Sequence, residues 1–251
     1  MSDVPVLEVR GLQKSFGSVP VTRNVDMTLK AGERRALIGP NGAGKTTFVN
    51  LLSGSLRPSA GQILLRGEDI THTNEAKRSK LGLGRTFQIT SLFPALTAHK
   101  NVFLPLAERA GAGVSIFRCA SSYRELHDRA DEILAQVGLL SVAQVPVQLL
   151  PYGQQRLVEI AVTLALDPSV LLLDEPAAGI PTSERDIILD IIEALPRDIA
   201  VLLIDHDMDL VFRIAQRITV LVQGAVLVEG TPAQIAADPQ VRSVYLGERE
   251  V

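Results

Sequence analysis

The chain has 251 residues, of which 46% are hydrophobic and 21% charged, as in an ordinary globular protein. Its net charge of −3, without a long basic run, argues against a protein that binds nucleic acid by charge alone. No apolar run approaches the roughly 20 residues that span a bilayer, and MSDVPVLEVR lacks the pattern of a secretory signal, so any membrane role is expected to act through a partner.

The first 90 residues predict strands around one helix. Apolar runs bounded by turn residues predict strands at 6–10, 21–29 and 34–38, the last running into GPNGAGKTT. A helix is expected to begin there and to end at Gly54. We then expect a strand in GQILLRGEDI, a short polar helix in NEAKRSK and a return to the sheet in LGLGRTFQ.

The pattern becomes helical from about residue 91 to residue 166. YRELHDRADEILAQVGL has apolar residues at a helical period and Gly138 as its stop, and RLVEIAVTLAL is a second helical run. The intervening GAGVSIFRCASS is rich in Gly and Ser and predicts a loop. Beyond residue 166, short apolar strands alternate with helices again, which argues for a parallel sheet covered on both faces.

The C-terminal third predicts strands in SVLLLDE and DIAVLLIDHD, helices in TSERDIILDIIEALP and MDLVFRIAQ, and a hairpin in ITVLVQGAVLVEG. The final expected helix is TPAQIAAD, with Thr231 as its N-cap and Pro232 in its first turn. We therefore expect a single domain over 1–251, with a core of about 1–90 and 167–251 and an inserted helical subdomain of about 91–166.

The motif GPNGAGKT, between the third strand and its helix, fits G-x-x-x-x-G-K-[ST]. The glycines let backbone N–H groups surround phosphate oxygens, and the helix N-terminus adds unpaired donors. Lys45 supplies a charge for the β- and γ-phosphates, and the Thr46 hydroxyl can ligate Mg²⁺. A chance match is the alternative, which the strand-before, helix-after context disfavours. We predict a nucleotide site made by Gly39, Pro40, Asn41, Gly42, Ala43, Gly44, Lys45 and Thr46.

Polar residues also stand at the ends of three other expected strands. VLLLDE brings Asp174 to the end of its strand, where it would hold a water on Mg²⁺, and Glu175 is suited to polarise an attacking water. His206 follows AVLLI and would donate to charge that develops on a γ-phosphate. Gln88 in RTFQ ends another strand. Taken alone, Asp174 and Glu175 are equally compatible with a solvated strand end, and His206 and Gln88 are more typical of an ordinary surface position.

The P-loop, Gln88, LPYGQQ, VLLLDE and His206 occur in the order found in ATP-binding cassette (ABC) proteins. The chain resembles that ATPase module over nearly its whole length. More narrowly, it resembles the ATP-binding subunit of branched-chain amino acid importers, in RTFQITSLFPALTAHKNV, LPYGQQRLVEIA, LLLDEPAAGIPTSE, DHDMDLVFRIAQRITVLVQGAVLVEGTP and QVRSVYLGE. The resemblance implies an α/β P-loop core with a mixed or parallel sheet, an N-terminal antiparallel β subdomain and an inserted helical subdomain.

The resemblance also implies roles for single residues. Gln88 would contact Mg²⁺ or water and sense the transmembrane subunit, and His206 would be the switch histidine. Phe16 would stack on adenine, with packing inside a turn as the alternative, and Thr47 would reach the α-phosphate. The signature that contacts a partner's ATP would be Leu150, Pro151, Tyr152, Gly153 and Gln154.

Four positions depart from the superfamily pattern. In the signature, Pro151 stands in place of serine and Tyr152 in place of glycine. Pro181 stands where the loop after the second acidic motif usually carries Asp, and Val162 stands in place of an Arg. The signature departures suggest an asymmetric pair, in which Gly153 and Gln154 suffice for one site.

The implied function is an ATP- and Mg²⁺-dependent ATPase that energises an importer, with Leu, Ile and Val as the leading substrates. Its expected partners are a second, distinct ATP-binding subunit in a head-to-tail dimer, permease subunits and, indirectly, a substrate-binding protein, without nucleic acid. The expected location is peripheral, on the cytoplasmic face of a bacterial inner membrane.

Other functions stay open. The importer could take urea, amides or other amino acids. A soluble ABC protein acting on DNA or ribosomes would carry a coiled-coil insertion, fused cassettes or a basic surface, none of which is visible. A small-molecule P-loop kinase leaves LPYGQ and His206 unexplained.

The remaining chemistry-bearing residues receive plainer interpretations. His72, His99 and His127 are expected to be isolated and solvated, and the charges of RELHDRADE to form the wet face of a helix. The single cysteine, Cys119, excludes an internal disulfide and favours a reducing compartment. Phe93, Pro94 and Leu96 either line a groove for a transmembrane partner's helix or belong to the core of the subdomain.

Overall fold

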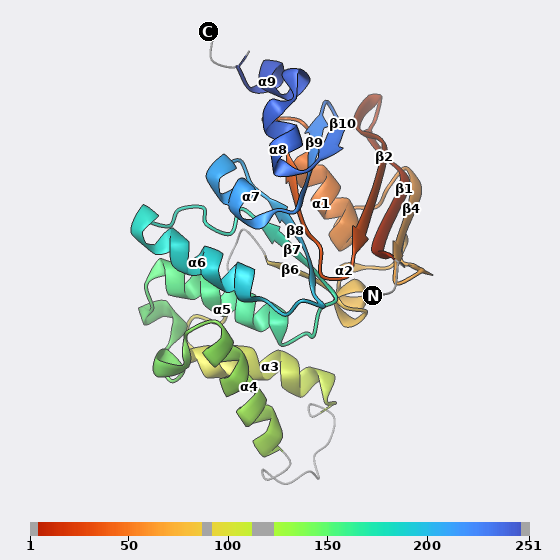
Figure 1. Cartoon of the computed structure of the whole chain (residues 1–251). Coiled ribbons are helices and arrows are strands. Elements are labelled where there is room, and N and C mark those ends of the chain that lie inside the picture. Colours follow the sequence, from red (N-terminus) through yellow and green to blue (C-terminus); the bar gives the residue numbers. More distant parts are fainter. Residues whose placement is uncertain (1–4, 87–91, 112–122, 247–251) are drawn as a thin grey trace. The chain divides into compact units, whose positions relative to one another are not determined.

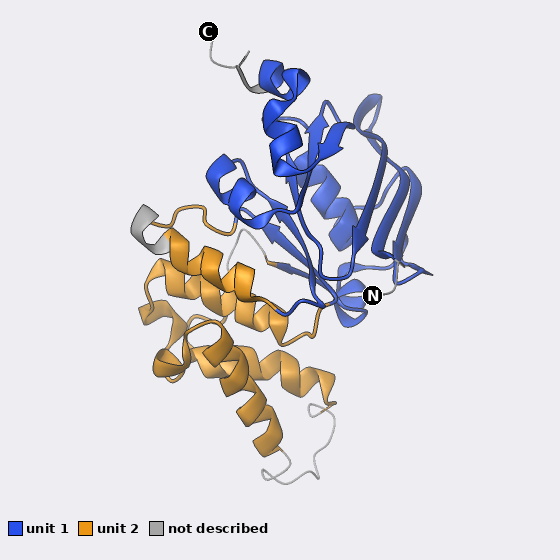
Figure 2. Cartoon of the chain, viewed as in Figure 1, with its two compact units in different colours: residues 1–85, 169–175, 196–251 blue, residues 86–168, 176–195 orange. Residues whose placement is uncertain are grey.

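The computed structural model describes residues 5–86, 92–111 and 123–246 (Figure 1). Gln88, Cys119 and nearly all of the expected loop at 111–122 lie outside these ranges. The chain forms two compact units, 1–85 with 169–175 and 196–251, and 86–168 with 176–195 (Figure 2). The expected core includes 176–195, a segment that the structure groups with the second unit.

An antiparallel sheet forms the N-terminal part of the first unit. It consists of β1 (Pro5–Phe16), β2 (Val19–Lys30), β4 (Ala60–Leu65) and β5 (Glu68–Asp69), in the order β2-β1-β4-β5. The first two strands are longer than expected and form one hairpin that turns at 17–18. Near the end of β2, buried apolar residues alternate with exposed polar ones, which is the pattern of a sheet with one covered face.

A second, mixed sheet forms the centre of the first unit. Its order is β10-β9-β3-β8-β7-β6, from β3 (Arg34–Ile38), β6 (Leu83–Thr86), β7 (Val170–Asp174), β8 (Ala200–Ile204), β9 (Arg217–Val222) and β10 (Ala225–Gly230). β3 runs parallel to both β8 and β9, and β7 runs parallel to β8, whereas β9 and β10 are antiparallel. The carboxyl ends of β3, β7 and β8 therefore meet at one edge of the sheet.

The helix α1 (Lys45–Ser53) links the two sheets through the core. Its buried residues Phe48, Val49, Leu51 and Leu52 join one apolar cluster with residues of both sheets. Gly54 ends the helix in a left-handed conformation with φ 88°, as its sequence position predicts. Burial of a continuous apolar face fixes the helix whose first turn carries the phosphate-binding motif.

The first unit also contains α2 (Glu75–Lys80). Its C-terminal part carries α7 (Met208–Ile214), α8 (Pro232–Ala237) and α9 (Pro239–Leu246). Thr231 forms the expected cap of α8, in a full capping box with Gln234. The expectation that α8 is the final helix is wrong, because α9 follows directly. Asp238 accepts the N–H groups of Gln240 and Val241, so the Asp-Pro pair after α8 begins a new helix.

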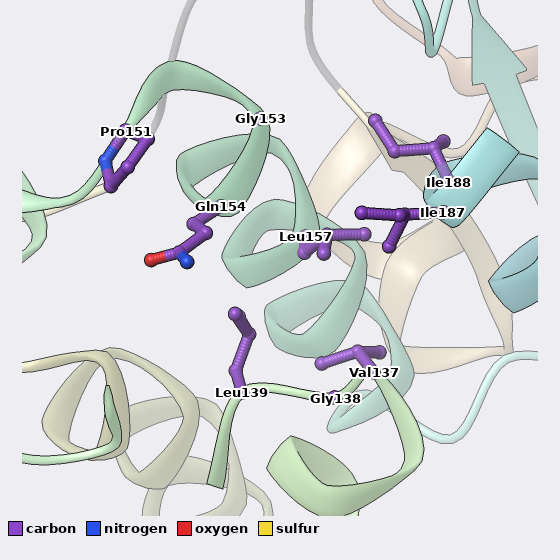
Figure 3. A pocket seen from close by; sticks show the side chains of 9 residues that line it. All are labelled: Val137, Gly138, Leu139, Pro151, Gly153, Gln154, Leu157, Ile187 and Ile188. Atoms are coloured by element: carbon purple, nitrogen blue, oxygen red, sulfur yellow. The ribbon is translucent and has the colours of Figure 1, made fainter. Parts of the chain in front are cut away.

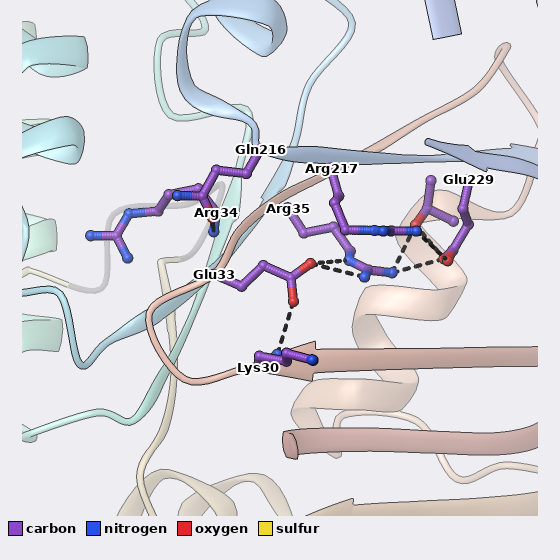
Figure 4. A network of polar contacts seen from close by, with 8 residues as sticks. Lys30, Glu33, Arg34, Arg35, Gln216, Arg217 and Glu229 are labelled. Atoms are coloured by element: carbon purple, nitrogen blue, oxygen red, sulfur yellow. Dashed lines mark hydrogen bonds and ion pairs between the residues drawn. The ribbon is translucent and has the colours of Figure 1, made fainter. Parts of the chain in front are cut away.

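A largely buried ion-pair network joins β3 to the two strands on one side of it, β9 and β10 (Figure 4). Arg35 binds Glu33 at 2.8 Å and Glu229 at 2.8 Å, and its side chain is 5% exposed. Glu229 also accepts the Thr219 hydroxyl at 2.7 Å. Because each buried charge has partners, the network ties β3 to β9 and β10 without leaving an uncompensated charge.

The second unit contains α3 (Ala98–Arg109), α4 (Arg124–Gln136), α5 (Tyr152–Leu164) and α6 (Thr182–Ala194), with short 3₁₀ turns at Leu140–Val142 and Val147–Leu149. α3 packs against α4 and α5, and α5 packs against α6. The charged residues of α4 are mostly exposed, whereas Ala130, Ile133 and Leu134 are buried. No helix within the described ranges is both long enough and apolar enough to cross a bilayer.

The expectation of isolated, solvated histidines is wrong for His99, whereas His127 is exposed as expected but is not isolated. His99 is buried, and its ring stacks on that of His127 with centroids 5.1 Å apart. His127 stacks in turn on Phe103 at 4.3 Å. The two histidines lie on α3 and α4, so only the packing of these helices brings the rings together. His72 is exposed, as expected.

Candidate active site

The phosphate-binding motif forms the turn between β3 and α1. Gly44 precedes α1 with φ 96°, and a Cβ atom at this position would lie 2.7 Å from the Val21 carbonyl oxygen. Glycine is therefore required here for both conformation and space. Ala43 donates its N–H to Pro40 O at 3.1 Å and accepts the Gly224 N–H at 2.9 Å. The loop is thus held on the tip of the β9–β10 hairpin.

Lys45 begins α1 and lies along the loop. Its Nζ donates to Gly39 O at 2.5 Å and to Pro40 O at 3.1 Å. α1 has no side-chain cap, so the N–H groups of its first turn point toward the space inside the loop. Thr46 is exposed and Thr47 half-buried on the same turn. The lysine charge, the N–H groups of the first helical turn and two hydroxyls are thus gathered in one loop, and these are the groups that bind phosphate.

Asp174 ends β7 and is buried, with 2% exposure. Its Oδ2 accepts Arg85 Nη2 at 3.1 Å, and Arg85 Nη1 donates to Asn50 Oδ1 on α1 at 2.7 Å. Arg85 therefore connects the acid at the end of β7 to the helix that carries the P-loop. The sequence reasoning missed Arg85, although it lies in the RTFQ stretch that drew attention to Gln88.

Glu175 and His206 meet at the ends of the neighbouring strands β7 and β8. His206 Nδ1 lies 3.3 Å from Glu175 Oε1, and the histidine side chain is 71% exposed. Glu175 has φ 46°, unusual for a residue with a side chain, and its N–H donates to Ile204 O at 2.8 Å. The carboxylate is therefore aimed by a backbone conformation that the sheet holds in place.

Asp205 supports the turn that carries His206. Its Oδ1 accepts the backbone N–H groups of His206 at 2.7 Å and Asp207 at 3.0 Å. Burial raises the pKa of the Asp205 carboxyl above its ordinary value, and the two hydrogen bonds offset part of that effect. The buried carboxylate of Asp205 thus fixes the backbone of the turn, and the turn presents the exposed imidazole of His206.

Thr46 and Asp174 are the residues that could hold Mg²⁺. They offer a hydroxyl and a carboxylate oxygen, the ligand class that Mg²⁺ prefers. They stand on the first turn of α1 and at the end of β7, within the same unit. The donor set fits the ion. Gln88, the third predicted ligand, lies outside the described residues.

Phe16 ends β1 and its side chain is 50% exposed. Lys14 Nζ lies 5.2 Å from the centroid of its ring. Half of the side chain is thus open to solvent, which leaves a face on which a planar base could stack.

The signature residues open α5 in the second unit. Leu150 is buried and its carbonyl oxygen accepts Gln155 Nε2 at 2.8 Å, whereas Tyr152 is 45% exposed. Pro151 is the N-cap residue and makes no side-chain cap bond, so the N–H groups of the first turn are left for a ligand. Gly153 is buried and Gln154 half-buried.

A pocket of about 310 Å³ adjoins the signature (Figure 3). The pocket is lined by residues at and near the start of α5, by the short apolar stretch that follows α4, and by two isoleucines of α6. Its lining residues are Val137, Gly138, Leu139, Pro151, Gly153, Gln154, Leu157, Ile187 and Ile188. The pocket separates the start of α5 from the middle of α6.

Fold and site together define a P-loop nucleotide-binding protein. The family model for ABC transporters matches residues 22–178, and the model for branched-chain amino acid ATP-binding cassette transporters matches residues 225–251. The chain is 40% identical, over 97% of its length and 98% of the relative's, to the high-affinity branched-chain amino acid transport ATP-binding protein LivG of Escherichia coli strain K12. The chain belongs to the ABC transporter family.

Solved structures agree with this assignment. The ADP conformation of MJ1267, an ATP-binding cassette of an ABC transporter, is similar with a TM-score of 0.84 and 26% identity, over 97% of this chain and 99% of that one. The dimeric structure of MJ0796, a bacterial ABC transporter cassette, is similar with a TM-score of 0.76 and 27% identity, over 90% and 98%. The expected fold class is confirmed, and the chain is an ATPase of this family that binds nucleotide.

Proposed function

We propose that this chain hydrolyses ATP to energise an importer of branched-chain amino acids. The observation that carries the proposal is the pairing of Glu175 with His206, 3.3 Å apart, at the strand ends beside the P-loop. The substrate class is supported by the family match at 225–251 and by the activity in the name of LivG. No part of this subunit would contact the transported solute.

The chain's own residues would divide the work of phosphoryl transfer. Lys45 and the N–H groups of the loop bind the phosphates, with Thr47 on the α-phosphate and Phe16 under the adenine. Glu175 takes a proton from the attacking water, and His206 donates to the transferring phosphoryl group. Thr46 and Asp174 would hold Mg²⁺, together with Gln88, and the ion would neutralise phosphate charge when bound.

A second cassette would complete the site. The MJ0796 dimer supports pairing of two cassettes, and we propose a head-to-tail arrangement in which Leu150–Gln154 contacts ATP held by the partner subunit's P-loop. Pro151 lacks the hydroxyl and N–H of a serine, and Tyr152 is bulky where glycine is usual. These losses would fall on the partner's nucleotide, which supports a distinct partner and an asymmetric pair.

Permease subunits would dock beside the start of α3. Phe93 is 58% exposed and Pro94 is exposed, so these two residues do not belong to the core of the subdomain. The side chain of Asn101 fixes the backbone at Phe93: it accepts the Phe93 N–H at 2.8 Å and donates to Phe93 O at 3.1 Å. An apolar ring presented by a fixed backbone suits a partner's helix. Through that contact the chain would sit peripherally at the cytoplasmic face of the membrane, with a substrate-binding protein as an indirect partner.

Nucleotide chemistry is tested first, on the assembled transporter. Lys45→Ala should abolish ATP binding, because it removes the charge that faces the phosphates. Lys77→Ala, which changes an exposed lysine on α2, should bind ATP normally. Glu175→Gln should bind ATP and fail to turn it over. Tight ATP binding by Lys45→Ala, or normal turnover by Glu175→Gln, would contradict the assigned roles. Filter binding and phosphate release measure the two properties.

The substrate is tested by uptake of labelled Leu in cells with and without this chain. Loss of Leu uptake on deletion, restored by the wild-type chain and not by Glu175→Gln, would support the proposal. Normal Leu uptake with impaired uptake of labelled urea, amides or other amino acids would identify a different importer. Metabolite phosphorylation by the purified chain would instead favour a kinase.

A further inference from the structure

The ring of Tyr152 lies over Gly179. A Cβ atom built on Gly179 would be 3.4 Å from Tyr152 Cε1 and 3.8 Å from both Cζ and the hydroxyl oxygen. These are ordinary van der Waals distances, so the ring covers the glycine with room for no more than a methyl group. Gly179 has φ 73°, which residues with a side chain rarely adopt. Both residues belong to the second unit.

Gly179 lies in the segment 176–181, which joins Glu175 to α6. Glu175 is anchored at one end by its backbone hydrogen bond to β8 at 2.8 Å. At the other end Ile180 is buried, and its carbonyl oxygen accepts Arg185 Nε at 3.1 Å. The segment is therefore a short link held at both ends, and a displacement of its middle must change the direction in which the chain leaves Glu175.

Glu175 is sensitive to such a change. Its φ of 46° lies in a sparsely populated region, which persists only while the surrounding structure maintains it. The chain passes from the first unit to the second between Glu175 and Pro176. A shift of 176–181 would consequently rotate the carboxylate that faces His206.

The remainder of Tyr152 is open to a ligand. The side chain is 45% exposed, and the residue begins a helix that has no side-chain cap. A nucleotide bound at the N–H groups of this helix would touch the same ring that covers Gly179. The pocket in Figure 3 leaves space between the start of α5 and Ile187 on α6. Close packing against α6 therefore does not hold the start of α5 in place at this pocket.

We infer that Tyr152 is a positioning residue that transmits binding of the partner's nucleotide to this chain's own Glu175, through Gly179 and segment 176–181. The inference rests on the proposed function, in which the signature contacts ATP held by the partner. With tyrosine in place of glycine, the signature backbone approaches the partner's nucleotide less closely. In exchange, the tyrosine ring connects that nucleotide to the catalytic site of this chain.

Steady-state kinetics of the assembled transporter test this role. Tyr152→Ala should lower kcat at saturating ATP by about 10- to 100-fold with little change in KM, because misplacing a catalytic group acts on the chemical step. Tyr152→Phe keeps the ring and should restore most of the turnover that Tyr152→Ala loses. Leu140→Ala, which removes another exposed apolar side chain of the same unit, should turn over like wild type. An unchanged kcat for Tyr152→Ala, a changed KM alone, or equal damage in Tyr152→Phe would overturn the inference.

Hydrogen exchange of the amides at 177–180 gives a second readout that is independent of turnover. ATP should slow this exchange in wild type and in Tyr152→Phe, but not in Tyr152→Ala, although ATP stays bound. Equal slowing in Tyr152→Ala would overturn the inference. Lys45→Ala and Glu175→Gln are measured alongside: if these two turn over normally, the proposed function fails, whereas if they are inactive and Tyr152→Ala is normal, only the connection through Gly179 fails.

Discussion

Arg78 is a buried cation that completes the end of the P-loop helix, and removing it should destabilise the first unit. Its side chain is 1% exposed. Nη1 donates to Leu51 O and Leu52 O, both at 2.6 Å, and Nη2 donates to Thr71 O at 2.8 Å. The first two acceptors are among the last carbonyls of α1, which lack partners within the helix. Burial lowers the pKa of Arg78 to about 10, so the group stays charged at neutral pH.

The substitution Arg78→Met keeps the aliphatic stem and removes the donors. Each of the three buried carbonyls that loses its partner costs about 1–3 kcal/mol, and relief from holding a buried charge returns part of this sum. We expect a net loss of about 3 kcal/mol in the free energy of unfolding. For a domain of this size, such a loss lowers Tm by about 6–12 °C. The Tm of Arg78→Lys should lie between those of wild type and Arg78→Met, because an ammonium group cannot donate to all three carbonyls as the planar guanidinium does.

The assay is thermal and urea unfolding followed by circular dichroism, with amide exchange in α1 as a local measure because the chain has two units. Lys77→Met is the matched control, since Lys77 is exposed on the same helix and its loss should cost less than about 0.5 kcal/mol. Equal Tm values for Arg78→Met and Lys77→Met, with unchanged exchange in α1, would refute the account of Arg78 as the cap of that helix.

Three further substitutions probe the first unit. Gly44→Ala should abolish ATP binding and lower stability by more than about 1 kcal/mol, because its φ is 96° and its Cβ would meet Val21 O at 2.7 Å, and ATP binding like wild type would contradict this. Arg35→Met removes the ion-pair partner of buried Glu33 and one of the partners of Glu229, which is 28% exposed, and should cost about 3 kcal/mol in urea unfolding, whereas an unchanged midpoint would contradict this. The pKa of Asp205 is raised in the folded state. Its favourable contribution to the free energy of unfolding is therefore complete below the ordinary pKa of about 3.9, and it is lost as the pH rises through the raised pKa. Asp205→Asn should therefore match wild type in the most acidic urea titrations and exceed it in stability at neutral pH, and a constant difference across pH would refute the assignment.

Local features of the fold and site follow from neighbouring residues, and the sequence by itself determined them. The strand at 34–38, the phosphate-binding turn and the stop at Gly54 are set by an apolar run, glycines and a helix end within a short stretch. The same holds for Asp174 at the end of β7 and for the capping box of Thr231. In each case the physical cause acts between residues a few positions apart in the chain, so the sequence pattern is enough to predict the local structure.

Contacts between distant segments were decided only by the tertiary structure. Arg85 reaches Asp174, His99 stacks on His127, and Arg78 is buried against α1, because sheet order and helix packing bring these residues together. A side chain's solvation depends on such neighbours, which is why an isolated histidine in the sequence became a buried one in the fold. The ring of Tyr152 on Gly179 belongs to the same class: the sequence shows that tyrosine is unusual in the signature, and only the approach of α5 to segment 176–181 shows what the ring contacts.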